Sequence, residues 1–203
     1  MKYLFFDLET TGLPERRLSS FGEYFSPKNF SHYNNSRIVS IAWMIYTDTG
    51  LLEKQHYYIV KPDNFKSSAR AIEVHKITEE IAQRDGVPIN DIMTEFRNDL
   101  NECDLLLSYN IDFDYNIFLS ECYRYAREDL ISLMNIAKQC CIMKKSKEIL
   151  KTINGMTKRY FKLEEVYREV FSDKEFSTAH NSLDDTLRCA QVYFKLIHGL
   201  TLE

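Results

Sequence analysis

Two acidic residues stand two positions apart near the start of the chain, directly after an apolar run. Residues 3–6 have the composition of a buried strand, and Asp7 and Glu9 follow before Thr10-Thr11-Gly12 ends it. Side chains at positions i and i+2 project from the same face of a strand, so both carboxylates point the same way. Such like charges repel and are costly to desolvate unless a cation lies between them. If the two carboxylates bind a cation, their hard oxygen ligands favour Mg²⁺ or Mn²⁺ over zinc. The alternative to a metal site is a strand that simply ends in solvent.

A second acidic pair follows the short apolar run at 105–108, where a strand is expected to give way to a helix. Open α/β sheets tend to build their sites at such junctions. Asp112 and Asp114 would both lie in the first helical turn, but a two-residue step rotates the helix by about 200°, so they cannot share a face. Favourable interaction with the helix dipole accounts for Asp112. The Phe113 ring is expected to anchor this turn in the core and so to fix where Asp114 points.

The third group, residues 179–185, opens the last expected helix. Asn181 is a good N-cap and Asp184 takes the capping position three residues later, which leaves Asp185 without a structural explanation. His180 precedes the helix and is of a type that accepts a proton near neutral pH. Taken alone, His180 is more typical of a surface loop residue.

Apolar runs and periodicities predict the elements that position these groups. Alternation and β-rich composition predict strands at 3–10, 38–46, 52–60 and 105–108, with a further strand at 139–143 inside the ambiguous stretch 130–145. Helical spacing and capping residues predict helices at 67–75, 78–84, 89–103, 112–126, 162–171 and 183–197. A run of three strands followed by alternating strands and helices indicates an α/β protein with a mixed sheet and helices packed on it.

Length and composition limit the class of protein. With 203 residues, the chain is expected to form a single domain, with residues 15–35 as a surface insertion near the site. The net charge of −4 and the pI near 5.8 exclude a global basic field, so polyanion binding needs local basic groups or bound metal. Five cysteines without zinc-ligand spacing predict reduced thiols and a cytoplasmic protein. Since no apolar stretch approaches membrane-spanning length, no membrane association is expected.

Together the three acidic groups resemble the DEDDh family of 3′–5′ exonucleases, which includes the proofreading subunit of the bacterial replicative polymerase (polymerase III epsilon), RNase T and oligoribonuclease. The resemblance covers nearly the whole chain, through FFDLETTGLP at 5–14, NIDFDYNIF at 110–118 and HNSLDD at 180–185. It implies an RNase H-like mixed five-stranded sheet flanked by helices, and two divalent metal ions, Mg²⁺ or Mn²⁺. The metal ligands that it implies are Asp7, Glu9, Asp114 and Asp185, with His180 as the general base.

The same resemblance implies contacts with a single-stranded 3′ end. The backbone of Thr10 and Thr11 and the side chains of Leu13 and Phe113 would meet the terminal nucleotide, with core anchoring as the alternative for Phe113. Residues 15–35 carry rings and basic groups that suit a single strand, or else pack that segment onto the body. A basic run of Lys144, Lys145 and Lys147 either touches substrate or forms a solvated face. Lys76 and Tyr109 depart from the family pattern, and both departures bear on substrate preference.

The expected reaction is hydrolysis of nucleic acid from the 3′ end with release of nucleoside 5′-monophosphates. DNA is favoured, in proofreading or repair, with RNA processing as the alternative, and a DNA polymerase partner is left open. Two other classes are weighed against this one. The first is a catalytically silent nucleic-acid-binding module, and the second is a haloacid-dehalogenase-type phosphatase, in whose DxDxT motif Glu9 is a poor fit for the second acid.

Overall fold

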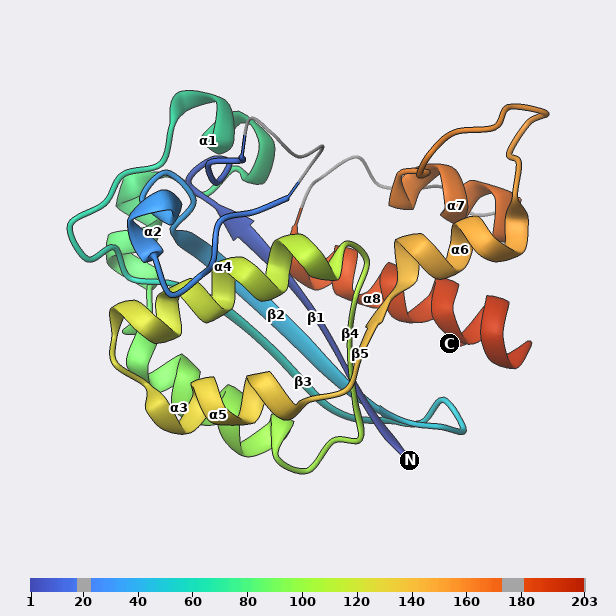
Figure 1. The fold of residues 1–203 in the computed structure, drawn as a ribbon, viewed down its shortest axis with the longest axis horizontal. Coiled ribbons are helices and arrows are strands. Elements are labelled where there is room, and N and C mark those ends of the chain that lie inside the picture. The colour runs from blue at the N-terminus through green and yellow to red at the C-terminus, as the bar shows by residue number, and fades with distance from the viewer. Residues whose placement is uncertain (18–22, 173–180, 203) are drawn as a thin grey trace.

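Five strands form one mixed sheet in the computed structural model, which describes residues 1–17, 23–172 and 181–202. The strands are β1 (Lys2–Thr10), β2 (Ile38–Thr47), β3 (Leu52–Ile59), β4 (Leu105–Ser108) and β5 (Gln139–Cys141). They lie in the order β3-β2-β1-β4-β5; β2 is antiparallel to both β1 and β3, and β4 is parallel to both β1 and β5. The prediction of a mixed five-stranded RNase H-like sheet is confirmed (Figure 1).

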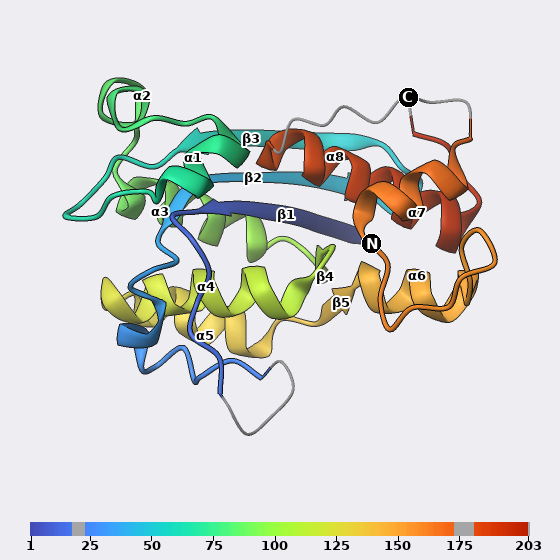
Figure 2. The same cartoon turned by 90° about the horizontal axis from the view of Figure 1, so that it is seen from above.

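Helices cover both faces of this sheet (Figure 2). The first face carries α3 (Ile89–Leu100), α4 (Ile111–Arg124) and α5 (Glu128–Ile136), and the other carries α7 (Leu163–Val170) and α8 (Ser182–Tyr193). The remaining helices are α1 (Ala69–His75), α2 (Glu79–Asp85) and α6 (Ile142–Leu150), with a 3₁₀ turn η1 (Phe30–Tyr33) and a π turn η2 (Phe194–His198). Among the described residues, none of the helices has the length and apolar character needed to cross a membrane.

The alternation along β1 decides which face carries the first two carboxylates. Its even positions 4, 6 and 8 pack into the core on the side of α3 and α4, whereas positions 3 and 5 pack into the core on the side of α8. Because side chains alternate across a strand, Asp7 and Glu9 continue the second series. Both acidic side chains therefore face α8.

The predicted strand at 139–143 is too long, because the chain turns into α6 at Ile142. Ile142 and Ser146 are both buried while Lys144 between them is exposed, which fits the helical period and not the two-residue period of a strand. The Met143 amide donates to the Tyr109 carbonyl at 2.8 Å, so this helix begins beside the end of β4. The ambiguous stretch 130–145 thus holds parts of two helices around a three-residue strand.

Candidate active site

Three carboxylates from opposite ends of the chain converge at one end of the sheet. Asp7 and Glu9 come from β1 and Asp185 comes from the first turns of α8. One carboxylate oxygen of each lies within 4.8 Å of the others, and all three residues are partly exposed. This is the spacing at which several acidic oxygens can share a cation.

The start of α8 is fixed over β1 by hydrogen bonds. The Asn181 side chain accepts from the Leu183 amide at 2.9 Å, as expected for an N-cap. The hydroxyls of Ser40 and Ser182 are 3.0 Å apart in the core, and Ser40 is the β2 residue paired with Glu9. The helix therefore starts beside Glu9, and Asp185 follows one turn later on the side of the strand.

Asp114 joins these three from α4, and we call the four residues Asp7, Glu9, Asp114 and Asp185 the acidic cluster. The Asp114 side chain is buried, accepts a hydrogen bond from the Ser108 hydroxyl, and is also hydrogen-bonded by the Leu8 amide. Asp112, two residues earlier, is exposed and pairs with Lys144 at 2.7 Å. The two aspartates thus point in different directions, as their helical spacing predicts.

The acidic cluster carries excess negative charge for its degree of burial. Burial raises the pKa of Asp7 well above its ordinary value, and the charges of Asp114, Asp185 and Glu9 add to this effect. Burial and the same neighbours raise the pKa of Glu9 to about 8. Burial raises the pKa of Asp114 to about 7, although the hydrogen bond from Ser108 opposes the rise. Hard oxygen donors that are mutually repelled in this way fit divalent metal ions, which would supply the missing positive charge.

The loop that follows β1 is held by hydrogen bonds to Arg37 and by one within the loop. The Thr11 amide donates to the Arg37 carbonyl at 2.9 Å, and the Arg37 amide donates to the Thr11 hydroxyl at 3.0 Å. The Thr10 hydroxyl donates to the Gly12 carbonyl at 2.7 Å. A Cβ on Gly12 would lie 2.8 Å from the Asn35 carbonyl oxygen, so only glycine fits without displacing backbone.

Leu13 extends from this loop with 71% of its surface exposed. An aliphatic side chain so exposed, at the end of a rigid loop beside the acidic cluster, is available to contact a ligand. Phe113 stands next to Asp114 on α4, half-buried and packed against the core. Both predicted roles of Phe113, core anchoring and substrate contact, are therefore compatible with its position.

A buried ion pair that sequence patterns did not reveal joins the β1 loop to α4. The Arg37 guanidinium donates to both Glu121 carboxylate oxygens, at 2.5 and 3.1 Å, and to the Tyr125 hydroxyl at 3.1 Å. It also lies 4.6 Å from the centroid of the Phe65 ring. Because Arg37 binds Thr11 through its backbone and Glu121 through its side chain, it connects the predicted substrate loop to the helix that carries Asp114. The only sign of this role in the sequence was the position of Arg37 directly before an apolar strand.

The predicted site residues are thus distributed over four elements. The structure brings Asp7, Glu9 and Asp185 together, holds Asp114 next to them, and places Thr10, Thr11 and Leu13 on the adjoining loop; His180 lies outside the described residues. Ser108, which orients Asp114, was not singled out from the sequence, although its place at the end of a buried strand is a weak signal of such a role.

A sequence model of a family described as exonuclease (RNase_T) matches residues 4–193. Among solved structures, exonuclease I of E. coli in a complex with single-stranded DNA superimposes with a TM-score of 0.72 and 16% identity, over 98% of this chain and 40% of that one. The nuclease domain of 3′hExo, a DEDDh family member bound to rAMP, gives a TM-score of 0.69 and 15% identity, over 98% and 92% of the two chains.

A third structure, a 3′-exonuclease that recognises the 3′ end of a histone mRNA stem-loop, gives a TM-score of 0.67 and 14% identity, over 98% of this chain and 82% of that one. No curated protein is significantly similar to the chain in sequence. The chain spans about two fifths of the length of exonuclease I. At identities this low, the structural likeness establishes the fold that all of these proteins share.

Proposed function

The chain belongs to the RNase_T exonuclease family, and on that premise we propose that it is a metal-dependent 3′–5′ exonuclease. It would hydrolyse phosphodiester bonds from the 3′ end and release nucleoside 5′-monophosphates. The observation that carries the proposal is the acidic cluster, where residues from β1, α4 and α8 meet at one end of the sheet. Neither a haloacid-dehalogenase-type phosphatase nor a binding module that has lost its ligands explains four converging carboxylates in this family.

In this proposal the acidic cluster holds two divalent metal ions, Mg²⁺ or Mn²⁺. When bound, such ions stabilise the negative charge that develops on the phosphate during hydrolysis. Ser108 and the Leu8 amide hold the Asp114 carboxylate in place, and the Ser40–Ser182 contact sets the position of Asp185. His180 is assigned as the general base that takes a proton from the attacking water, on the strength of the sequence motif.

The loop after β1 would receive the terminal nucleotide. Its backbone at Thr11 is fixed by Arg37, and its exposed Leu13 side chain offers an apolar surface to a base or sugar. Phe113 would contact the same nucleotide from α4. A single-stranded 3′ end suits this arrangement because an unpaired base is free to contact these side chains.

DNA is the substrate that we propose, with RNA as the alternative. The structural neighbours include one protein bound to single-stranded DNA and another that recognises a histone mRNA stem-loop, so both classes of substrate occur on this fold. Phosphodiester chemistry at the acidic cluster does not itself read the 2′-hydroxyl. Association with a DNA polymerase and a cytoplasmic location stay predictions.

The test is digestion of labelled single strands. DNA and RNA 20-mers, labelled at either the 3′ or the 5′ end, are incubated with Mg²⁺ or Mn²⁺, and the products are separated by size. We expect labelled mononucleotides to appear at once from the 3′-labelled strands. The 5′-labelled strands should give a ladder of progressively shorter fragments that keep their label. Asp7→Ala and Asp114→Ala should reduce the rate at least a hundredfold, because each removes charge from the acidic cluster.

Asp112→Ala is the matched control, since Asp112 lies on the same helix turn as Asp114 but pairs with Lys144 at the surface. It should keep the rate within a few-fold of the wild type. Products released from the 5′ end, internal cleavage, or equal activity in Asp7→Ala and the wild type would each contradict the proposed function.

A further inference from the structure

Positive charge is concentrated in one stretch of an otherwise acidic chain. Residues 142–162 contain seven Lys and Arg residues and a single acidic residue, Glu148, whereas the whole chain has 26 basic against 30 acidic residues. This stretch comprises α6 and the segment that leads to α7. A local basic surface of this kind is what a protein of net charge −4 needs to hold a polyanion.

Two of these lysines share one face of α6, and a third follows directly after the helix. Lys144 and Lys147 are spaced i and i+3, and Lys147 donates a hydrogen bond to the carbonyl of Lys151, the residue that ends the helix, so the three lie in a row. Lys144 pairs with Asp112, in the first turn of α4, at 2.7 Å. Figure 1 shows α6 leading away from that turn. The row therefore extends from the entrance of the candidate active site outward.

The segment after α6 lies along the same row. The Tyr109 hydroxyl, from the end of β4, donates to the Phe161 carbonyl at 2.8 Å, and the Lys147 ammonium lies 4.9 Å from the centroid of the Phe161 ring. Arg159 lies 5.4 Å from the centroid of the Tyr160 ring, which is 37% exposed. The pKa of Lys144 lies above its ordinary value, chiefly because of the hydrogen bond to Asp112, and the nearby Tyr160 hydroxyl contributes a smaller part.

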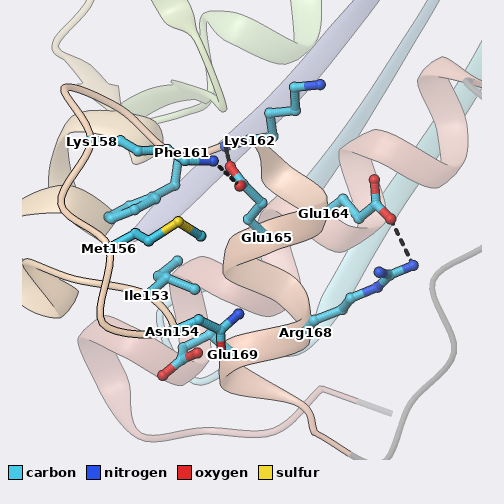
Figure 3. Close-up of a pocket in the computed structure, with 10 residues that line it drawn as sticks. All are labelled: Ile153, Asn154, Met156, Lys158, Phe161, Lys162, Glu164, Glu165, Arg168 and Glu169. Atoms are coloured by element: carbon cyan, nitrogen blue, oxygen red, sulfur yellow. Dashed lines mark hydrogen bonds and ion pairs between the residues drawn. The ribbon is translucent and has the colours of Figure 1, made fainter.

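This segment is fixed in place by α7. Glu165 accepts a hydrogen bond from the Lys162 amide at 2.9 Å and pairs with Lys158. Figure 3 shows Phe161 and Lys162 close to Glu165, above a cavity of about 410 Å³ that none of the acidic cluster lines. Because Lys158 on one side, and Phe161 and Lys162 on the other, are held by α7 and Tyr109, Arg159 and Tyr160 between them take a defined position.

Lys144 is paired with Asp112, but among the residues that the structure describes the other basic groups of the row have no such acidic neighbour. Within the described parts of the chain, no acidic side chain forms an ion pair with Lys147, Lys151 or Arg159. By contrast, Lys145 on the other side of α6 pairs with Glu148. Three uncompensated cations beside an exposed ring combine the two elements of single-strand binding, namely phosphate contact and base stacking.

We propose that this basic ridge (Lys144, Lys147, Lys151, Arg159 and Tyr160) binds the part of the nucleic acid strand that lies 5′ of the terminal nucleotide. The inference rests on the proposed function for the position of the 3′ end. In this arrangement the acidic cluster contacts the scissile phosphate, and the ridge contacts phosphates and a base farther along the strand. Tyr109 would act as a positioning residue, since its hydroxyl attaches the ridge to the end of β4.

Two substrates and two triple variants test this inference. The ridge variant carries Lys147→Gln, Lys151→Gln and Arg159→Gln, and the control variant carries Arg84→Gln, Arg97→Gln and Lys145→Gln. Both lose three positive charges, but only the first loses them from the ridge. Activity is measured on a single-stranded 20-mer and on the p-nitrophenyl ester of thymidine 5′-monophosphate, which is too short to reach the ridge. Binding of the 20-mer is measured separately by fluorescence anisotropy, with Asp7→Ala added to prevent cleavage.

For the ridge variant we expect ester hydrolysis within twofold of the wild type and a KM for the 20-mer raised at least tenfold. Each phosphate contact with a single strand contributes about 0.7 to the slope of log affinity against log salt concentration, so the slope should fall by about 2. The control variant should change neither the KM nor the slope. Melting temperatures of both variants show whether a loss comes from misfolding.

Unchanged 20-mer binding by the ridge variant, or an equal loss in the control variant, overturns the inference. So does a ridge variant that loses affinity for polyglutamate or for anionic vesicles but keeps its affinity for the 20-mer. If the wild type cleaves neither substrate, the proposed function fails, and anisotropy alone then decides the inference about the ridge, because strand binding does not require cleavage.

Discussion

Glu9→Gln should stabilise the protein in the absence of metal, although it removes a proposed metal ligand. The pKa of Glu9 is raised from 4.5 to about 8 in the folded chain, so between these values the folded state holds a proton that the unfolded state has released. The stability of the metal-free protein therefore falls as pH rises from about 5 to 8. Glutamine keeps the size of the side chain and remains neutral throughout, so the variant should escape this loss.

The magnitude follows from the size of the shift. For a carboxyl that titrates alone, the penalty at pH 8 would be about 4 kcal/mol, and at pH 5 it would be under about 1 kcal/mol. Glu9 is partly exposed and shares its protons with the rest of the acidic cluster, which reduces the gain at pH 8 to about 2 kcal/mol. In a domain of this size, 2 kcal/mol corresponds to a melting temperature about 4–8 °C higher.

The assay is thermal unfolding at pH 5, 6, 7 and 8 in EDTA, repeated with Mg²⁺ or Mn²⁺. The difference between Glu9→Gln and the wild type should grow with pH in EDTA, and it should shrink or reverse when metal is added. Glu73→Gln, at an exposed position on α1, is the matched control and should show no such trend. A constant difference across the pH range, or a variant less stable than the wild type at pH 8 in EDTA, would refute this reasoning.

Three further outcomes follow from the same structure. Arg37→Met should cost about 3–5 kcal/mol in urea unfolding because it leaves the buried Glu121 with only a longer contact to Arg124, at 3.6 Å, and the double variant Arg37→Met/Glu121→Leu should recover much of this loss. Gly12→Ala should raise the KM for a strand several-fold while changing the free energy of unfolding by less than about 2 kcal/mol, because its Cβ displaces the loop that carries Leu13. Metal binding should release protons and strengthen from pH 6 to pH 8, since the pKa values of about 8 and about 7 in the acidic cluster oppose ligation at lower pH; calorimetry in two buffers of different ionisation enthalpy measures this release.

Patterns of short range predicted most of the fold. The alternation of β1 and the capping residue Asn181 each depend on neighbours within four positions, and the structure has them as expected. The start of α6 was mispredicted because Gln139–Cys141 and the residues after it have similar β-forming character, and the turn at Ile142 depends on a contact with the Tyr109 carbonyl. That contact links segments 34 positions apart, and no local pattern reports it.

In the candidate site, too, the residues marked by local patterns could be predicted, and those that depend on contacts between distant segments could not. The four carboxylates could be found because each stands at the end of a recognisable element, where a charged residue has no local explanation. Arg37 and Ser108 could not be assigned roles, because their importance lies in partners on other elements: Glu121 for the first and Asp114 for the second. A charged residue can be recognised in the sequence, but the residue that pairs with it is known only from the folded structure.

The acidic cluster combines the first strand of the chain with its last α-helix, and this affects when the protein can act. During synthesis Asp7 and Glu9 are made before Asp185, which follows almost every other element of this domain. A chain that still lacks α8 therefore lacks one of the carboxylates of the acidic cluster. The acidic cluster is complete only once α8 has packed onto the sheet beside β1.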